Sequence, residues 1–169
     1  MLCNLCAGII NKNTNVCSEC GVAFTGQLNI LQLEEIIKCG NPEDRYVVSA
    51  MVNAAKAYNM GSKGAAPNKE KAHIYAKTAA ENKGGEALMM SGMLDIDKAI
   101  DGEDGDEFSR EEALLMIIGL RKLACAHHLG FYPASILLTN LIDNDKWGVG
   151  SIMEEMMNKD DPSLWYWEK

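Results

Sequence analysis

The sequence predicts a mainly α-helical protein, a short solenoid of antiparallel helix pairs that follows a small N-terminal module built on cysteines. Two Cys-x-x-Cys pairs lie near the N-terminus, and apolar residues recur at helical spacing from residue 27 onward. Small residues also repeat in a fixed pattern between residues 50 and 87. The 169 residues suffice for one ordinary domain with a small appendage. We therefore expect residues 1–26 to form the module and residues 27–169 the helical domain.

Composition and charge exclude several classes of protein. Hydrophobic residues make up 47% of the chain and charged residues 24%, which is typical of a folded globular protein rather than a disordered one. No apolar run is long enough to span a membrane, and the N-terminus lacks the basic flank of a secretory signal. The net charge of −8 disfavours a general nucleic-acid binder, because phosphate binding needs a surplus of Lys and Arg. These observations indicate a cytoplasmic protein without a membrane partner.

The charges are unevenly distributed along the chain. Residues 56–83 contain six lysines against two glutamates, whereas residues 95–112 contain nine acidic residues against two basic ones. Solvated helix faces and an acidic loop account for this pattern most simply. The alternative is a surface that steers a charged protein partner toward the molecule.

The N-terminal cysteines have metal-ligand spacing, C-x2-C-x10-C-x2-C. Each pair can turn two sulfurs toward one point, and a hairpin through the polar residues 11–15 brings the points together. Four thiolates in a tetrahedron suit Zn²⁺, and a segment this short depends on its metal for most of its folding free energy. We expect short strands near residues 8–10 and at Val16. The predicted metal ligands are Cys3, Cys6, Cys17 and Cys20.

This stretch, CNLCAGIINKNTNVCSECGVAF, resembles the short zinc-ribbon modules found at the ends of many bacterial and archaeal proteins. Gly8 and Gly21 allow the tight turns after each cysteine pair, while Ala7 stands where such modules usually have glycine. The resemblance implies one structural zinc ion, and four cysteine ligands leave no open position for a substrate. Iron in a rubredoxin-like site is the alternative metal. A thioredoxin-type redox site needs a single pair at a strand-to-helix junction, which two reciprocal pairs do not provide.

The helical pattern begins with a predicted capping helix over residues 27–40, for which Gly40 is the C-cap. Asn41 as N-cap and Pro42 at the first helical position predict that the next helix starts there and runs to about residue 59. Glycines at 61 and 64 end that helix, and the pair at 67–68, proline and asparagine, opens another that extends to residue 83. These two helices form the expected first repeat, residues 41–87.

Matching small residues mark the two helices of this repeat. Small side chains at this spacing let antiparallel helices approach closely, while Tyr58 and Tyr75 fill the space between pairs. The two halves read Ala50-x3-Ala54-Ala55-x2-Tyr58-x2-Gly61 and Glu70-Lys71-Ala72-x2-Tyr75-x3-Ala79-Ala80-Glu81. This pattern resembles a Sel1-like repeat, a relative of the tetratricopeptide repeat, and the resemblance is clearest over residues 50–87.

The resemblance weakens along the rest of the chain. A second repeat over residues 87–133 departs from the family pattern at Asp95, where an aromatic residue is expected, and contains an acidic insertion. Residues 134–169 form a partial third repeat and a C-terminal cap, with Trp165 and Trp167 either closing the last helix pair or anchoring a partner. The family implies six to eight helices stacked in antiparallel pairs.

Other motifs do not predict chemistry. The acidic insertion at residues 101–107 fails as a calcium loop, because Gly105 stands where an oxygen ligand is needed and Asp106 where glycine is required. The adjacent His127 and His128 point about 100° apart on a helix and cannot easily share one metal. No catalytic motif of the common hydrolase, metalloprotease or phosphate-binding types occurs. We therefore expect no enzyme activity, no catalytic residues and no cofactor beyond zinc.

The sequence thus predicts a non-catalytic adaptor or regulator that binds another protein through its helical repeats, the mode that the Sel1-like resemblance implies. A phage or mobile-element protein that acts on a host factor fits the same features. The alternative is a regulator that contacts nucleic acid through the zinc ribbon. Lys12 and Phe24 are the only basic and aromatic residues of that module, which undersupplies phosphate contacts and base stacking.

Overall fold

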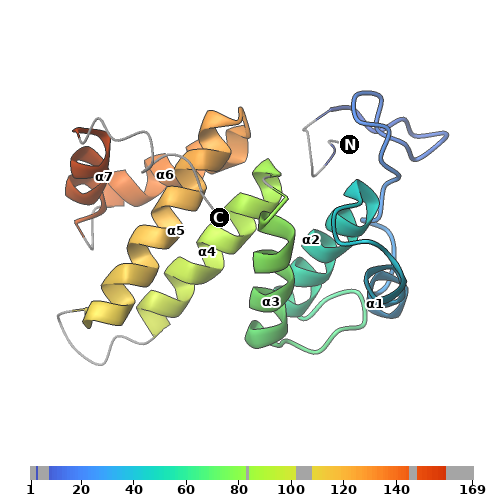
Figure 1. Cartoon of the computed structure of the whole chain (residues 1–169), viewed down its shortest axis with the longest axis horizontal. Coiled ribbons are helices and arrows are strands. Elements are labelled where there is room, and N and C mark those ends of the chain that lie inside the picture. The colour runs from blue at the N-terminus through green and yellow to red at the C-terminus, as the bar shows by residue number, and fades with distance from the viewer. Residues whose placement is uncertain (1–2, 4–7, 83, 102–107, 145–147, 159–169) are drawn as a thin grey trace. The chain divides into compact units, whose positions relative to one another are not determined.

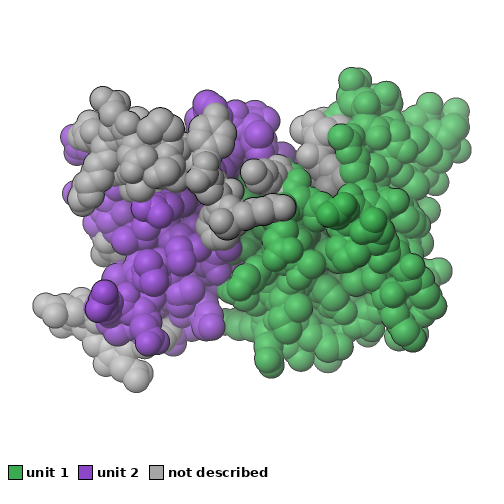
Figure 2. All heavy atoms as spheres, viewed as in Figure 1, with its two compact units in different colours: residues 1–91 green, residues 92–169 purple. Residues whose placement is uncertain are grey.

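The structure, a computed structural model, describes residues 3, 8–82, 84–101, 108–144 and 148–158. This part of the chain is mainly helical, as predicted, and forms two compact units, residues 1–91 and 92–169 (Figure 2). Its strand pairing is limited to isolated bridges, so the expected strands near residues 8–10 and at Val16 are not formed as such. The helices, labelled in Figure 1, are α1 (Ile30–Cys39), α2 (Arg45–Met60), α3 (Lys69–Ala80), α4 (Gly85–Asp101), α5 (Arg110–His128), α6 (Tyr132–Asn144) and α7 (Val149–Asn158).

Helix α1 begins three residues later than the pattern predicts, because a capping box sets its first turn. The Asn29 side chain accepts a hydrogen bond from the Gln32 backbone N–H at 3.0 Å, and the Gln32 side chain accepts one from the Asn29 N–H at 3.0 Å. Residues 27–29 therefore lie outside the helix. The predicted end is confirmed, since the N–H of Gly40 donates to the carbonyl of Ile36.

The predicted start of α2 at Asn41 and Pro42 is wrong. The Asn41 side chain accepts from the Glu43 N–H at 3.1 Å, and the Asn41 carbonyl accepts from the Asp44 N–H at 2.9 Å, which closes a turn instead of a helix. Asp44 is the N-cap, and its carboxylate accepts from the Tyr46 N–H at 2.7 Å.

The ends of the following helices agree more closely with the sequence. Gly61 ends α2 in the left-handed conformation, with φ of 62°, which glycine adopts without strain. Asn68 caps α3 through the Lys71 N–H, as expected, but α3 ends at Ala80 rather than at residue 83. Helix α5 ends at His128, and Gly130 shortly after it has a positive φ of 79°.

The core of residues 1–91 consists of small side chains between closely packed helices. Helix α2 packs against α1 on one side and α3 on the other (Figure 1). Val48, Met51 and Val52 of α2 pack with Ala79 of α3, and Ile36 of α1 covers their edge. The alanines of the repeated pattern that are fully buried are Ala50, Ala54, Ala55, Ala72 and Ala79, together with their neighbours Ala57 and Ala76.

In residues 92–169, α4 and α5 touch through their backbones. A Cβ atom added at Gly92 would lie 2.7 Å from the carbonyl oxygen of Gly119, and one added at Gly119 would lie equally close, at 2.7 Å, to that of Gly92. Near this crossing the buried Lys122 ammonium lies 2.5 Å from the Asp95 carboxylate. Asp95, at which the predicted resemblance to a repeat pattern is interrupted, therefore forms an ion pair between the two helices.

The predicted C-terminal cap is described only in part. Val149 and Met153 of α7 are buried, and α7 packs against α6. Leu164, Trp165 and Trp167 lie outside the described residues, as does the acidic insertion from residue 102 to 107.

Candidate metal centre

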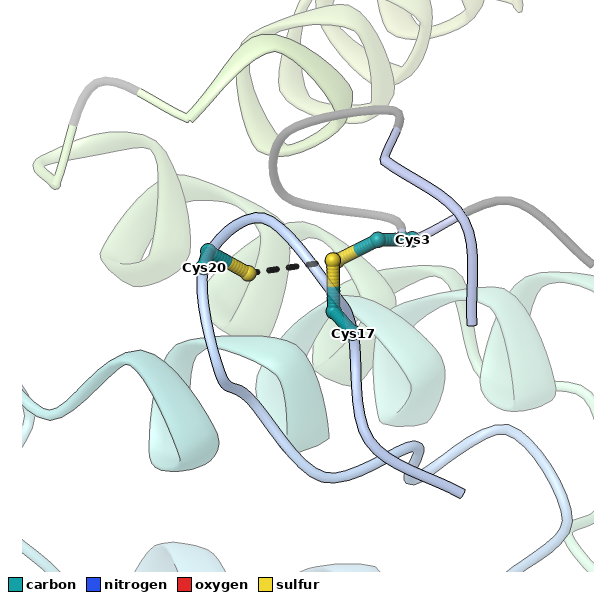
Figure 3. A group of neighbouring side chains, drawn as sticks. All are labelled: Cys3, Cys17 and Cys20. Carbon is teal, nitrogen blue, oxygen red and sulfur yellow. Dashed lines mark hydrogen bonds between the residues drawn. The ribbon is translucent and has the colours of Figure 1, made fainter. Parts of the chain in front are cut away.

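Three of the four predicted ligands lie together at the N-terminus. The sulfur atoms of Cys3, Cys17 and Cys20 are all within 4.8 Å of one another and point toward one another (Figure 3). Cys3 and Cys17 are buried, whereas Cys20 is partly exposed. Cys6, the fourth predicted ligand, lies outside the described residues.

The sulfur spacing fits a shared metal ion. Tetrahedral thiolates about 2.3 Å from Zn²⁺ have sulfurs about 3.8 Å apart. The Cys3 and Cys20 sulfurs lie 3.6 Å apart, close to that separation. A disulfide needs about 2.05 Å, and neither residue is in one. The arrangement therefore has the spacing of a metal-binding group of thiols.

Each of the two cysteine pairs forms a backbone hydrogen bond of the same type. The Cys3 N–H donates to the carbonyl of Gly8 at 2.8 Å, and the Cys17 N–H donates to the carbonyl of Val22 at 3.0 Å. In each pair the first cysteine thus reaches the fifth residue after it. In the sequence, Cys6 follows Cys3 by three residues, as Cys20 follows Cys17.

Each cysteine pair is followed by a turn that needs glycine. A side chain at Gly8 would not have enough space, and Gly21 has a backbone conformation that favours glycine. A Cβ atom at Gly8 would lie 2.5 Å from Cγ of Glu19 and 3.0 Å from the sulfur of Cys17. Gly21 has φ of 70°, and its N–H donates to the Cys17 carbonyl at 3.0 Å. Both glycines that the sequence singled out therefore shape the cysteine cluster directly.

The module has little apolar core besides its cysteines. Ile10 packs with Cys3 and Cys17, and Phe24 covers them in part. Bridges pair Ile10 with Cys17 and Val16 with Ala23, but no longer ladder forms among the described residues. So few apolar contacts stabilise a fold weakly, and a metal bound to the thiolates would supply most of the remaining free energy.

The other cysteines and the paired histidines lie elsewhere. Cys39, at the end of α1, is exposed and donates to the Glu35 carboxylate at 3.2 Å, a contact that raises the pKa of the thiol. Cys125 is half-buried in α5, and neither cysteine forms a disulfide. His127 Nδ1 lies 2.6 Å from the hydroxyl of Ser135 on α6, so this histidine contacts a neighbouring helix.

A polar cluster that the sequence did not predict joins α1, α2 and α3. Glu34 Oε1 accepts hydrogen bonds from Tyr58 at 2.6 Å, Tyr75 at 3.2 Å and Lys71 at 3.3 Å. The two tyrosine rings stack with centroids 6.0 Å apart. The Tyr58 hydroxyl is the main cause of a lowered pKa at Glu34. In the sequence, Glu34 stands four residues after the apolar Ile30 and therefore on the same face of its helix, a position that could have indicated a contact with a neighbouring helix.

Several lysines of the basic segment also contact the protein itself. Lys56 forms an ion pair with Glu86, Lys63 donates to the Gly26 carbonyl, and Lys71 reaches Glu34. The two ion pairs, of Lys56 and Lys71, neutralise part of the positive charge of residues 56–83. They leave less of it for steering a charged partner.

Among the helices that the structure describes, none combines the length and apolar character needed to cross a lipid bilayer. No protein-family model, curated protein or solved structure matches the chain. The features that bear on function are therefore the cysteine cluster and the packing of the helices.

Proposed function

We propose that this protein is a non-catalytic adaptor or regulator that binds a partner protein through its helical repeats. The observation that carries the proposal is the complete burial of the repeated alanines, such as Ala54 and Ala79. Their burial supports closely packed antiparallel helices of the Sel1-like kind, because small side chains at the contacts let neighbouring helices approach closely. Proteins built this way commonly act by presenting an extended surface to another protein.

Exposed apolar side chains on the outer helices support the same proposal. Leu31 on α1 is 74% exposed and Ile74 on α3 is 55% exposed, although both are large aliphatic residues. The Glu34 cluster links these two helices, so both side chains belong to one packed group of helices. A partner protein that covers such residues gains the free energy of burying them.

The proposed metal is one structural zinc ion held by Cys3, Cys6, Cys17 and Cys20. A site closed by four thiolates stabilises its fold and has no open position for substrate. When bound, the ion supplies cross-links between the two cysteine pairs. The chain's own contribution is to orient the sulfurs through the paired backbone hydrogen bonds of Cys3 and Cys17.

A binding experiment with surface variants tests the docking proposal. The immobilised protein is exposed to lysate of its native host, and retained proteins are identified by mass spectrometry, then purified and tested for direct binding. We expect a partner that binds the wild type and is lost from the variant carrying Leu31→Asp and Ile74→Asp. Ile142→Asp, which alters an exposed residue of α6, serves as the matched control and retains the partner.

Two outcomes contradict the proposal. In one, the immobilised protein retains no partner protein and instead binds DNA or RNA with a steep dependence on salt, as the nucleic-acid alternative requires. The other is a purified partner that binds the wild type and the variant carrying Leu31→Asp and Ile74→Asp with equal affinity, since that excludes these helical positions as part of the docking surface.

A further inference from the structure

The segment of residues 24–30 joins the cysteine module to the helices, and the change from one to the other occurs at a single peptide bond. Phe24 belongs to the module, since it packs against Cys3 and Cys17 and its N–H donates to the carbonyl of Asn15 at 2.6 Å. The next residue, Thr25, is completely buried and has its side-chain contacts in α2.

Thr25 is held by a buried polar network. Its hydroxyl shares a hydrogen bond of 2.8 Å with the Ser49 hydroxyl and accepts another of 2.8 Å from the Asn53 amide. The same amide group donates to the Ser49 carbonyl at 3.0 Å. Because an unpaired buried polar group is costly, the three side chains stabilise one another in a single arrangement.

The residues after Thr25 extend the attachment to the start of α1. The Gly26 carbonyl accepts a hydrogen bond from the Lys63 ammonium, and the Lys63 carbonyl accepts one from the Ile30 N–H at 3.0 Å. The Leu28 N–H donates to the Thr25 carbonyl at 3.1 Å. The position of Thr25 thus determines where the chain enters α1.

We propose that metal binding at the cysteine cluster is thermodynamically coupled, through Thr25, to the packing of α1 on α2. The inference rests on the metal site of the proposed function and adds a regulatory consequence. Without metal, the small core around Ile10 no longer fixes the position of Phe24. Thr25, the next residue, then loses a restraint that keeps it in its hydrogen-bond network. Helix α1, which carries the exposed Leu31, then packs less tightly, so the docking surface responds to metal loss.

Such coupling is reciprocal, and this property gives the first test. If metal binding stabilises the Thr25 network by a given factor, the intact network strengthens metal binding by the same factor. A variant that weakens the network must therefore bind the metal more weakly. Thr25→Val keeps the shape of the side chain but removes its hydroxyl, whereas Thr25→Ser retains the hydroxyl. Thr78→Val is the matched control, because the Thr78 hydroxyl bonds only to the carbonyl of Ile74 within α3 among the contacts described.

We expect the dissociation constant for Zn²⁺, measured by competition with a chromophoric chelator, to rise about tenfold in Thr25→Val. Thr25→Ser and Thr78→Val should remain close to the wild type. Equal zinc affinity in Thr25→Val and the wild type would overturn the coupling.

Hydrogen exchange on the wild-type chain provides a test that does not depend on any variant folding. On removal of zinc, the amides of α1, such as that of Leu33, should exchange faster, while those of α5 should not change. If the chain binds zinc and α1 exchanges at the same rate with and without it, the coupling is refuted although the metal site stands. If the chain binds no zinc at all, the metal site and the coupling are both refuted.

Discussion

Two carboxylates in residues 1–91 have pKa values shifted in opposite directions. The pKa of Glu34 is lowered, chiefly by the hydroxyl of Tyr58, with a smaller contribution from Lys71. The pKa of Glu86 is raised by burial, and its ion pair with Lys56 opposes that shift only in part. Each shift links a local contact to the stability of the fold at a given pH.

These shifts predict opposite pH dependences for two matched variants. Since the folded state lowers the pKa of Glu34, its stabilising effect is present above the ordinary carboxyl pKa and is lost as the pH falls through the folded value. Glu86 behaves in the reverse way, because its raised pKa makes the protonated form favour folding, and this contribution is lost as the pH rises through the folded value.

Thermal melts from about pH 7 to about pH 4 measure both effects. As the pH falls, the melting temperature of the wild type relative to Glu34→Gln should decrease, and that relative to Glu86→Gln should increase. The metal site is common to all three proteins, so its own pH dependence largely cancels in the comparison. Two differences that move in the same direction would show that one of these environments is described wrongly.

At the scale of helices, close packing depends on side chains without bulk. Replacing Ala54 or Ala79 with Leu inserts three carbon atoms where the side chain is fully buried, and should destabilise the fold by about 1–3 kcal/mol. Ala66→Leu, in the exposed loop between α2 and α3, is the matched control and should change stability by less than about 0.5 kcal/mol. Chemical denaturation measures all three changes. Unchanged stability in the Ala54 and Ala79 variants would mean that helices do not meet at those positions.

Helix positions could be predicted well from the sequence, and their ends less well. Gly40 and Gly61 were predicted as breaks because glycine there ends an apolar periodic run, and both are confirmed. The start of α2 was predicted wrongly because Asn41 and Asp44 are both good caps. The Asn41 side chain accepts a hydrogen bond from the Glu43 N–H in a turn instead of capping the helix. Residue preferences alone do not decide between these two roles.

At the scale of the whole molecule, contacts between distant residues account for what the sequence did not reveal. The bond between Thr25 and Ser49 spans 24 positions, and that between Glu34 and Lys71 spans 37. Helical periodicity identifies the buried face of each helix but not the helix that covers it. The approach of Cys3, Cys17 and Cys20 was easier to predict, because the two Cys-x-x-Cys pairs lie close together in the sequence and have metal-ligand spacing.

One zinc ion is proposed to join the two cysteine pairs of the N-terminal module, and the proposed coupling of that module to the helices requires the same ion. Native mass spectrometry of the intact chain, purified without chelators, measures it directly. We predict the mass of the chain plus one zinc ion, loss of that ion in Cys17→Ser, and its retention in Cys39→Ser, which alters an exposed thiol outside the cluster. A folded wild-type chain that carries no metal, or that carries zinc equally well after Cys17→Ser, would contradict the account.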